Sequence, residues 1–251
     1  MKIAVYTALY GEKDILRPPN GYSREEDISY FVFSDNELDV PPYQNILKPI
    51  IYEDVAKNAR YFKIMGDTIL SEYDILIWHD ANIQLEHTEI KNLVTLTSQT
   101  FLTTFAHPNR NDFYSEAMTC IRVEKDFSLR LLKQSWIYFL NGMPAHHGLC
   151  STGILIKNYD NPPGNALEFW WQQTLKYSRR DQLSLAYTIF RQKLNITLIR
   201  EDILNNKYSK YHLHNHTYYE EKSKVMSYNF WIFKQISFYG VKLIRKIKKM
   251  Q

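Results

Sequence analysis

A carboxylate and an amide end a strongly apolar run in the first third of the chain. The run is YDILIWHDANI, residues 73–83, and its last polar side chains are Asp80 and Asn82. An acid at the point where a buried strand emerges is held rigidly near solvent, which suits binding of a divalent cation and its phosphates. A strand-to-loop turn explains the same residues, because Asp and Asn hydrogen-bond their own backbone in such turns.

Three arginine and lysine side chains stand where an anion would need them. Arg60 and Lys63 lie three residues apart on a predicted helix, beside its apolar stripe. Such a pair would neutralise a leaving diphosphate as charge develops on it, and a solvated surface pair is the alternative. Arg110 offers planar, bidentate donors for a phosphate or a carboxylate, and a simple ion pair with Glu116 is equally open.

Three later segments carry acids or histidines that suit binding or catalysis. SRRDQLS (178–184) places Asp181 near the positive end of a predicted helix, where a carboxylate is stabilised and a neighbour would act as N-cap. The loop NGMPAHHGLCSTG (141–153), with three glycines and two histidines, is typical of a shaped binding loop, although simple loop histidines fit as well. YHLHNH (211–216) puts three histidines on one face of an extended segment, as metal ligands or as surface side chains.

The elements that would position these groups alternate between strands and helices. Apolar runs bounded by turn residues predict strands at 2–9, 30–34, 74–79, 101–106 and 152–157. Helical spacing occurs at 165–177, at 181–193 and in Val55, Ala59, Phe62, Gly66 and Ile69. This order predicts an α/β fold with a mostly parallel central sheet flanked by helices, which binds ligands at the carboxyl ends of its strands.

Length and composition limit the number of domains and the class of protein. The chain has 251 residues and is 45% hydrophobic, so we expect one domain with one sizeable core. No apolar run reaches the roughly 18 residues that cross a bilayer, and MKIAVYTALYG lacks the features of a signal peptide, so we expect a cytoplasmic protein. Cys120 and Cys150 have no CxxC spacing, and we expect both to be reduced.

The positive net charge belongs to the C-terminal tail. Residues 229–251 contain six Lys and Arg and no acid, which leaves 25 basic against 27 acidic side chains in residues 1–228. We therefore expect a domain at 1–228 and a basic tail at 229–251. In the tail, helical spacing of apolar residues predicts an amphipathic helix on an anionic membrane: Ile232, Ile236, Tyr239, Leu243 and Ile247. A helix packed back on the domain is the alternative, and no nucleic-acid partner is expected because no other basic stripe occurs.

Several of these motifs occur together in one known family. In order and spacing, the chain resembles a glycosyltransferase family formerly termed domain of unknown function 616, through TALYG (7–11), YFVFSD (30–35), AR-x-x-K (59–63), YDILIWHDANI (73–83), HPNR (107–110), GMP-x-x-HGL (142–149) and SRRDQLS (178–184). That family is similar to GT-A enzymes. The resemblance therefore implies a GT-A-like, Rossmann-type sandwich, in which a DxD-type strand end holds a metal and the diphosphate of a nucleotide sugar. Asn82 departs from that motif, since an amide is an uncharged ligand.

The resemblance also implies a role for each group. The residues it assigns to the donor nucleotide are Thr7, Ala8, Asp35, Arg60, Lys63, Asp80, Asn82 and Arg110. Those assigned to the acceptor and the donor sugar are His107, His146, His147, Gly148 and Arg180. Asp181 and Gln182 would face the reacting carbon, and a similar DQ pair in retaining enzymes favours retention. A divalent cation, Mn²⁺ or Mg²⁺, would be bound by Asp80 and Asn82 together with His214 or His216.

These expectations define a metal-assisted glycosyltransferase. It would move a sugar from a nucleotide sugar, probably UDP-linked, to a cell-surface polysaccharide or a lipid-linked glycan, at the inner face of the cell membrane. A sugar nucleotidyltransferase would share the strand-end acids, but TALYGEKD has one glycine where that class has a glycine-rich phosphate loop. A non-catalytic carbohydrate-binding or scaffold subunit is the third interpretation, favoured if nucleotide binding is absent.

Overall fold

The chain forms two compact units. The computed structural model describes residues 1–11, 14–25, 27–97, 99–214 and 227–250. The first unit, here called the sheet unit, comprises 1–108, 151–167 and 195–216; the second, the helical unit, comprises 109–150, 168–194 and 217–251. The predicted boundary between residues 228 and 229 stays a prediction.

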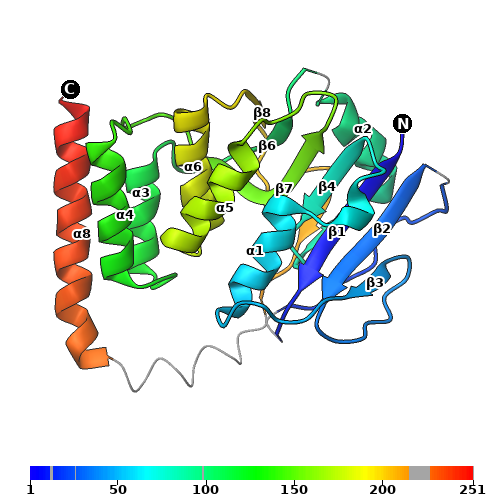
Figure 1. The fold of residues 1–251 in the computed structure, drawn as a ribbon, viewed down its shortest axis with the longest axis horizontal. Helices are drawn as coiled ribbons and strands as arrows, with labels where there is room; N and C mark the ends of the chain where they lie inside the picture. The colour runs from blue at the N-terminus through cyan, green and yellow to red at the C-terminus, as the bar shows by residue number, and fades with distance from the viewer. Residues whose placement is uncertain (12–13, 26, 98, 215–226, 251) are drawn as a thin grey trace. The chain divides into compact units, whose positions relative to one another are not determined.

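The sheet unit is built on seven strands in the order β3-β2-β1-β4-β7-β6-β8 (Figure 1). Pairs β1–β2, β1–β4, β2–β3 and β6–β8 are parallel, whereas β7 runs antiparallel to β4. The strands are β1 Ile3–Leu9, β2 Ile28–Ser34, β3 Gln44–Leu47, β4 Ile75–His79, β6 Leu102–Ala106, β7 Cys150–Asn158 and β8 Ile196–Ile199. A separate pair joins β5 Ile83–Leu85 to β9 Ser209–Tyr211. The predicted mixed, mostly parallel α/β sandwich is confirmed.

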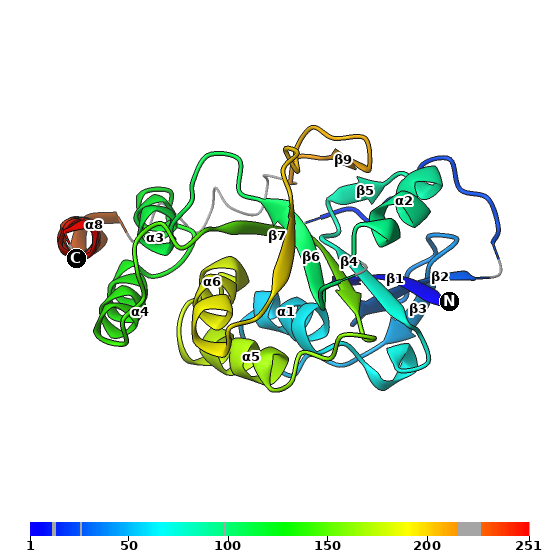
Figure 2. The same cartoon turned by 90° about the horizontal axis from the view of Figure 1, so that it is seen from above.

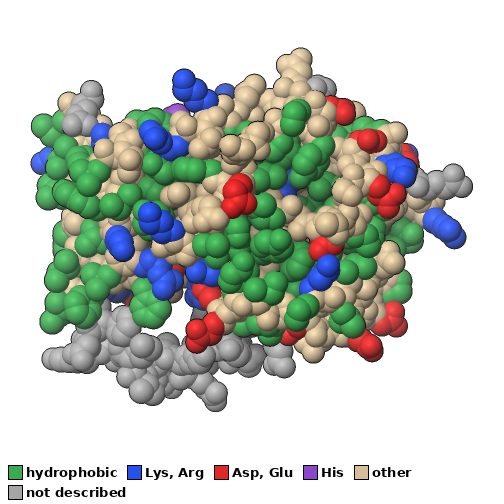
Figure 3. Space-filling view, in the orientation of Figure 1, with side chains coloured by type: hydrophobic (Ala, Val, Ile, Leu, Met, Phe, Trp, Pro, Cys, Tyr) green, Lys and Arg blue, Asp and Glu red, His purple; other side chains and the backbone are tan. Residues whose placement is uncertain are grey.

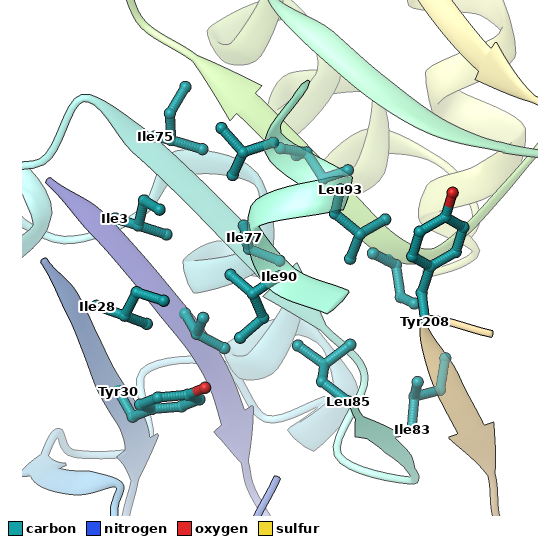
Figure 4. Close-up of a cluster of buried hydrophobic side chains, with 14 of the residues drawn as sticks. Ile3, Ile28, Tyr30, Ile75, Ile77, Ile83, Leu85, Ile90, Leu93 and Tyr208 are labelled. Atoms are coloured by element: carbon teal, nitrogen blue, oxygen red, sulfur yellow. The ribbon is translucent and has the colours of Figure 1, made fainter. Parts of the chain in front are cut away.

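One face of the sheet is covered by α2 (Ile90–Thr95) and by the β5–β9 pair, and the other by α1 (Val55–Met65) (Figure 2). On the first face, Ile3, Ile75 and Ile77 pack against Ile90 and Leu93 in one buried cluster (Figure 4). Because β1 and β4 are buried on both sides, all but one residue of each is apolar or aromatic. This continuity is why the sequence shows them as unbroken apolar runs.

The α1 face is aromatic and contains a buried cation. Phe62 of α1 stacks on Phe33 of β2, with ring centroids 4.6 Å apart. Lys157 of β7 is fully buried and donates to the backbone oxygens of Lys63 and Ile64, at 2.7 and 2.8 Å. It therefore satisfies carbonyls that the last turn of α1 leaves without helical partners.

The helix predicted from Val55 to Ile69 is shorter than expected. It ends at Met65, since Gly66 takes a positive φ of 77° and its N–H closes on the Phe62 oxygen. Ile69 lies instead in a separate 3₁₀ turn, Thr68–Leu70. Glycine adopts a positive φ at little cost, which lets the chain leave the helix at this point.

The helical unit contains α3 (Phe113–Arg122), α4 (Ser128–Leu140), most of α5 (Ala166–Lys176), α6 (Asp181–Gln192) and α8 (Ser227–Lys249). The predicted helices at 165–177 and 181–193 are confirmed. Tyr138 of α4 stacks on Tyr187 of α6, and Val241 and Ile244 of α8 join the same buried cluster. Among the described helices, none combines the length and apolarity needed to cross a membrane.

Candidate functional site

Asp80 directly follows β4 and is fixed by both its backbone and its side chain. Its backbone N–H donates to the backbone oxygen of Gly153, and its backbone oxygen accepts from the N–H of Ile83, each at 2.8 Å. The turn that the sequence allowed is therefore present. The Asp80 Oδ1 atom accepts from Lys63 Nζ at 3.1 Å and from Trp78 Nε1 at 3.0 Å. With 30% of the side chain exposed, the strand end presents an oriented carboxylate to solvent.

The two predicted cations differ in access. Lys63 has no solvent exposure and contacts Asp80 from inside the protein, whereas Arg60 is 18% exposed, with its Nη1 atom 3.8 Å from Asp80 Oδ1. They are therefore not a solvated surface pair. Of the two, Arg60 is the more accessible from solvent.

Gly153 of β7 allows the close approach of that strand to the Asp80 turn. A Cβ atom there would lie 2.7 Å from Ile83 Cδ1, 2.9 Å from Ile203 Cδ1 and 3.9 Å from Asp80 Oδ2. Sequence reasoning did not place Gly153 at the site. The available signal was an isolated glycine inside a predicted strand, which often marks a close backbone approach.

Asn82 is nearly buried and serves as an anchor. Its side-chain Nδ2 atom donates to the backbone oxygen of His212 at 3.0 Å. The backbone N–H of His212 donates in turn to the backbone oxygen of Asn82 at 2.9 Å. This exchange ties the segment after β9 to the end of β4. The amide that was predicted to bind a metal is engaged with the backbone.

The predicted histidine ligands do not complete a metal site in the part of the chain that the structure describes. His214 Nδ1 lies 2.5 Å from Asp14 Oδ1, and His216 falls outside the described residues. Among the described residues, no group of three or more His, Cys, Asp and Glu is arranged to hold a metal ion. The predicted divalent-cation site stays a prediction, because one or two carboxylates together with the phosphates of a bound nucleotide are enough to hold such an ion.

The predicted nucleoside contacts lie on β1 and just after β2. Thr7 and Ala8 are buried in β1, where they pair with Val32 and Phe33 of β2. The Thr7 hydroxyl is buried and has no hydrogen-bond partner among the described residues. Asp35 follows β2 and is half-buried. His107 of the same unit is also half-buried, after β6.

In the helical unit, Arg110 belongs to a buried polar group. Its Nε atom donates to Glu116 Oε2 at 2.5 Å, so the open alternative of an ion pair is present. Glu116 Oε1 also accepts from the Cys120 thiol at 3.4 Å. Burial raises the pKa of Cys120 to about 12, although the Arg180 guanidinium opposes the shift. Cys120 and Cys150 are both free thiols, as expected.

The loop at 142–149 is held against the start of α3. Gly148 N–H donates to the Asn111 oxygen at 2.9 Å, and His146 Nδ1 lies 3.0 Å from Asn111 Oδ1. Both residues have positive φ, 97° at Gly148 and 61° at His146, the latter uncommon for a side chain with a Cβ. His147 is exposed and lies edge-on to the Phe190 ring. The loop is thus shaped, as predicted.

Asp181 is the first residue of α6 and is buried, with Arg180 at the N-cap position. Trp170 Nε1 donates to the Asp181 backbone oxygen at 2.9 Å, and Gln182 Nε2 donates to the Cys150 oxygen at 2.8 Å. The turn before them is fixed by Asp126, whose Oδ2 accepts from Ser178 Oγ and Arg179 N–H. Sequence reasoning missed Asp126 because it lies more than fifty residues away.

The fold and the strand-end groups define an α/β protein of the Rossmann-like kind, in which polar side chains at the ends of buried strands meet a ligand. A comparison with protein families makes this class specific. Residues 44–216, more than half of the chain, match the TOD1/MUCI70, glycosyltransferase-like domain, so the chain belongs to that glycosyltransferase-like family. The matched range includes Asp80 and Asp181 and ends before α8. No curated protein matches the chain.

Proposed function

We propose that the protein is an active glycosyltransferase that takes a sugar from a nucleotide sugar, with UDP as the nucleotide. The observation that carries this proposal is the Asp80 group: a partly exposed carboxylate oriented by buried Lys63 and by the Trp78 indole, beside the more accessible Arg60. We further propose that Asp80 and Asn82 act as a DxD-type strand end, as in the family formerly termed domain of unknown function 616.

In this reaction the bond between the anomeric carbon and the diphosphate oxygen breaks, and the electron pair leaves with the diphosphate. Arg60 would bind that developing charge, which is the role in which an oriented guanidinium contributes most. The acceptor hydroxyl forms the new bond to the anomeric carbon and passes its proton to the departing diphosphate oxygen, which lies on the same side of the sugar when the configuration is retained. Asp181 and Gln182 are the proposed groups at the reacting carbon, in a retaining mechanism.

The other predicted contacts extend this proposal. Thr7, Ala8 and Asp35 would contact the nucleoside, and Arg110, His107, His146, His147, Gly148 and Arg180 would contact phosphate, sugar or acceptor. The acceptor would be a cell-surface polysaccharide or a lipid-linked glycan at the inner face of the cell membrane. A divalent cation, Mn²⁺ or Mg²⁺, would be bound by Asp80 and Asn82 together with His214 or His216, and the experiment below varies it.

Thermal unfolding with a panel of nucleotides, each with and without Mn²⁺, tests the proposal. A ligand present at 100 times its Kd stabilises the folded state by about 2.7 kcal/mol, so UDP or a UDP-sugar should raise the Tm where other nucleotides do not. Release of UDP in the presence of acceptor would establish transfer. No nucleotide binding at all would favour the scaffold subunit, and formation of a nucleotide sugar from a nucleoside triphosphate would favour the nucleotidyltransferase.

A further inference from the structure

Helices α4 and α8 together expose an apolar surface that neither the fold nor the proposed reaction uses. We propose that this α4–α8 surface docks the helical unit on an anionic phospholipid bilayer. The α4–α8 surface is defined by Leu129, Trp136 and Leu140 of α4 and Ile232, Ile236, Tyr239, Leu243 and Ile247 of α8. The proposal does not rest on the proposed reaction.

Helix α8 has one face that is needed for folding and another that is not. Ser237, Val241 and Ile244 are buried against the helical unit. A Cβ at Gly240 would lie 2.8 Å from Leu132 Cδ1, so the glycine lets α8 approach α4 closely. On the opposite face, Tyr239 and Leu243 are each 60% exposed. The packing alternative is therefore realised, while the apolar stripe predicted from the sequence stays accessible.

Helix α4 extends the apolar surface beside α8. Trp136 is 50% exposed and stacks on Phe139, and the Lys248 Nζ atom lies 4.8 Å from the Phe139 ring centroid. Leu129, Leu132, Lys133 and Trp136 line an open, mostly apolar hollow. Figures 1 and 2 both show the two helices side by side, and Figure 3 shows hydrophobic side chains with Lys and Arg among them over α8.

Charge identifies the partner. Neither α4 nor α8 contains a carboxylate, although together they carry eight Lys and Arg. Two of the tail cations are paired within the helical unit: Arg245 donates to Asp112 Oδ1 at 3.2 Å and to Oδ2 at 3.0 and 2.7 Å, and Lys234 binds Glu124 at 2.6 Å. The cations left for a partner on α8 include Lys242, Lys246 and Lys249, which are exposed and share one helix face.

A lipid surface fits this pattern better than a protein does. Lysine is depleted in the cores of protein interfaces, and a second copy of the chain in a two-fold dimer would set this positive face against itself. Exposed Trp and Tyr beside leucine and isoleucine, flanked by lysines, are instead typical of helices that lie in the headgroup region of an anionic membrane. The apolar side chains would enter the bilayer, and the three lysines would meet lipid phosphates.

Flotation of the full chain with vesicles of phosphatidylglycerol and phosphatidylcholine tests the proposal. We expect binding at low salt that weakens as salt rises, because the attraction is screened. Ile236→Ser with Leu243→Ser should abolish binding, whereas Ile50→Ser with Ile51→Ser, which makes the same change at exposed positions of the sheet unit, should not. Lys242→Gln, Lys246→Gln and Lys249→Gln together should weaken partitioning on the order of 100-fold.

The matched charge control is Lys2→Gln, Lys207→Gln and Lys210→Gln, at exposed positions of the sheet unit. All substituted side chains are exposed, so the variants should unfold at the temperature of the parent. Point variants are preferable to removal of 229–251, which would leave buried Asp112 without Arg245. The proposal is overturned if the parent stays unbound at low salt, or if test and control variants lose binding equally. It is also overturned if Ile236→Ser with Leu243→Ser dissociates a dimer without changing lipid binding.

Discussion

Asp80 and Lys63 form a pair in which only the carboxylate meets solvent. The lysine is completely buried; its Nζ atom lies 3.1 Å from Asp80 Oδ1 and 5.7 Å from the centroid of the Trp78 ring. Removing one partner of a buried pair leaves the other charge uncompensated, which costs more than the pair itself contributes. The geometry of the carboxylate and the stability of the strand end are therefore linked.

We predict that Asp80→Ala folds but loses glycosyl transfer. The variant lacks the oriented carboxylate of the proposed donor site, so turnover should fall at least about 100-fold, and the Tm should fall because buried Lys63 loses its contact with Asp80. Nucleotide release at saturating donor measures the first effect and calorimetry the second. The control is Asp74→Ala, which removes the acid directly before the first residue of β4. Its turnover should equal that of the parent. Normal turnover in Asp80→Ala would contradict the assignment.

Asp181→Asn tests the reacting centre. The change is nearly isosteric, and because the proposed role is at the anomeric carbon, kcat should fall far more than donor affinity. Glu168→Gln, an exposed acid in the first turn of α5, is the matched control and should leave both unchanged. Steady-state kinetics together with a donor binding assay separate the two quantities. If only the KM for the donor rises, Asp181 is a binding residue.

Strands β7 and β5 pack tightly against each other beside the turn at Asp80. The antiparallel β7 strand carries Gly153 there, and two isoleucine methyl groups fill the space that a side chain would need. Close packing of this kind leaves little room for adjustment.

We predict that Gly153→Ala destabilises the sheet unit by about 1–3 kcal/mol through overpacking. Adding Ile83→Val and Ile203→Val removes both Cδ1 atoms that the new methyl group would meet, so the triple variant should regain part of the loss. Urea unfolding of the parent, the single and the triple variant measures this. A triple variant less stable than Gly153→Ala by the full cost of two Ile→Val changes would show that the Cδ1 atoms are not the obstacle.

The free energy of unfolding of the protein should depend on pH through Lys157. Burial, with a smaller contribution from the Lys63 charge, lowers the pKa of Lys157 to about 7, whereas an unfolded chain has a lysine pKa of about 10.4. Between these values the folded state has released a proton that the unfolded state still holds. The free energy of unfolding should therefore rise as pH increases from about 7 to about 9. Below about 7 both states hold the proton, so this group should make the free energy of unfolding neither rise nor fall with pH.

Denaturant titrations at several pH values check this prediction. Lys157→Met keeps the length of the side chain but cannot titrate, so its stability should change less with pH over the same range. Lys210→Met, at an exposed position, is the control and should retain the slope of the parent. Equal slopes in Lys157→Met and the parent would show that another group titrates.

The amino-acid pattern predicted the strands β1, β2, β4, β6 and β7 and the helices α1, α5, α6 and α8, because their apolar runs and helical spacing are local features. It did not predict the short strands β3, β5, β8 and β9 or the helices α2, α3 and α4. It also placed Asp80 at a strand end, Asp181 at the start of a helix and an apolar stripe on the tail. Which distant groups lie in contact depends on the packing of the folded chain. Asn82 bonds to His212, Arg245 to Asp112 and Gly240 packs on Leu132, each more than one hundred residues apart in the chain. Such pairs depend on the order of the strands and on the packing of the helices. The sequence around either residue of a pair therefore contains no pattern that predicts its partner.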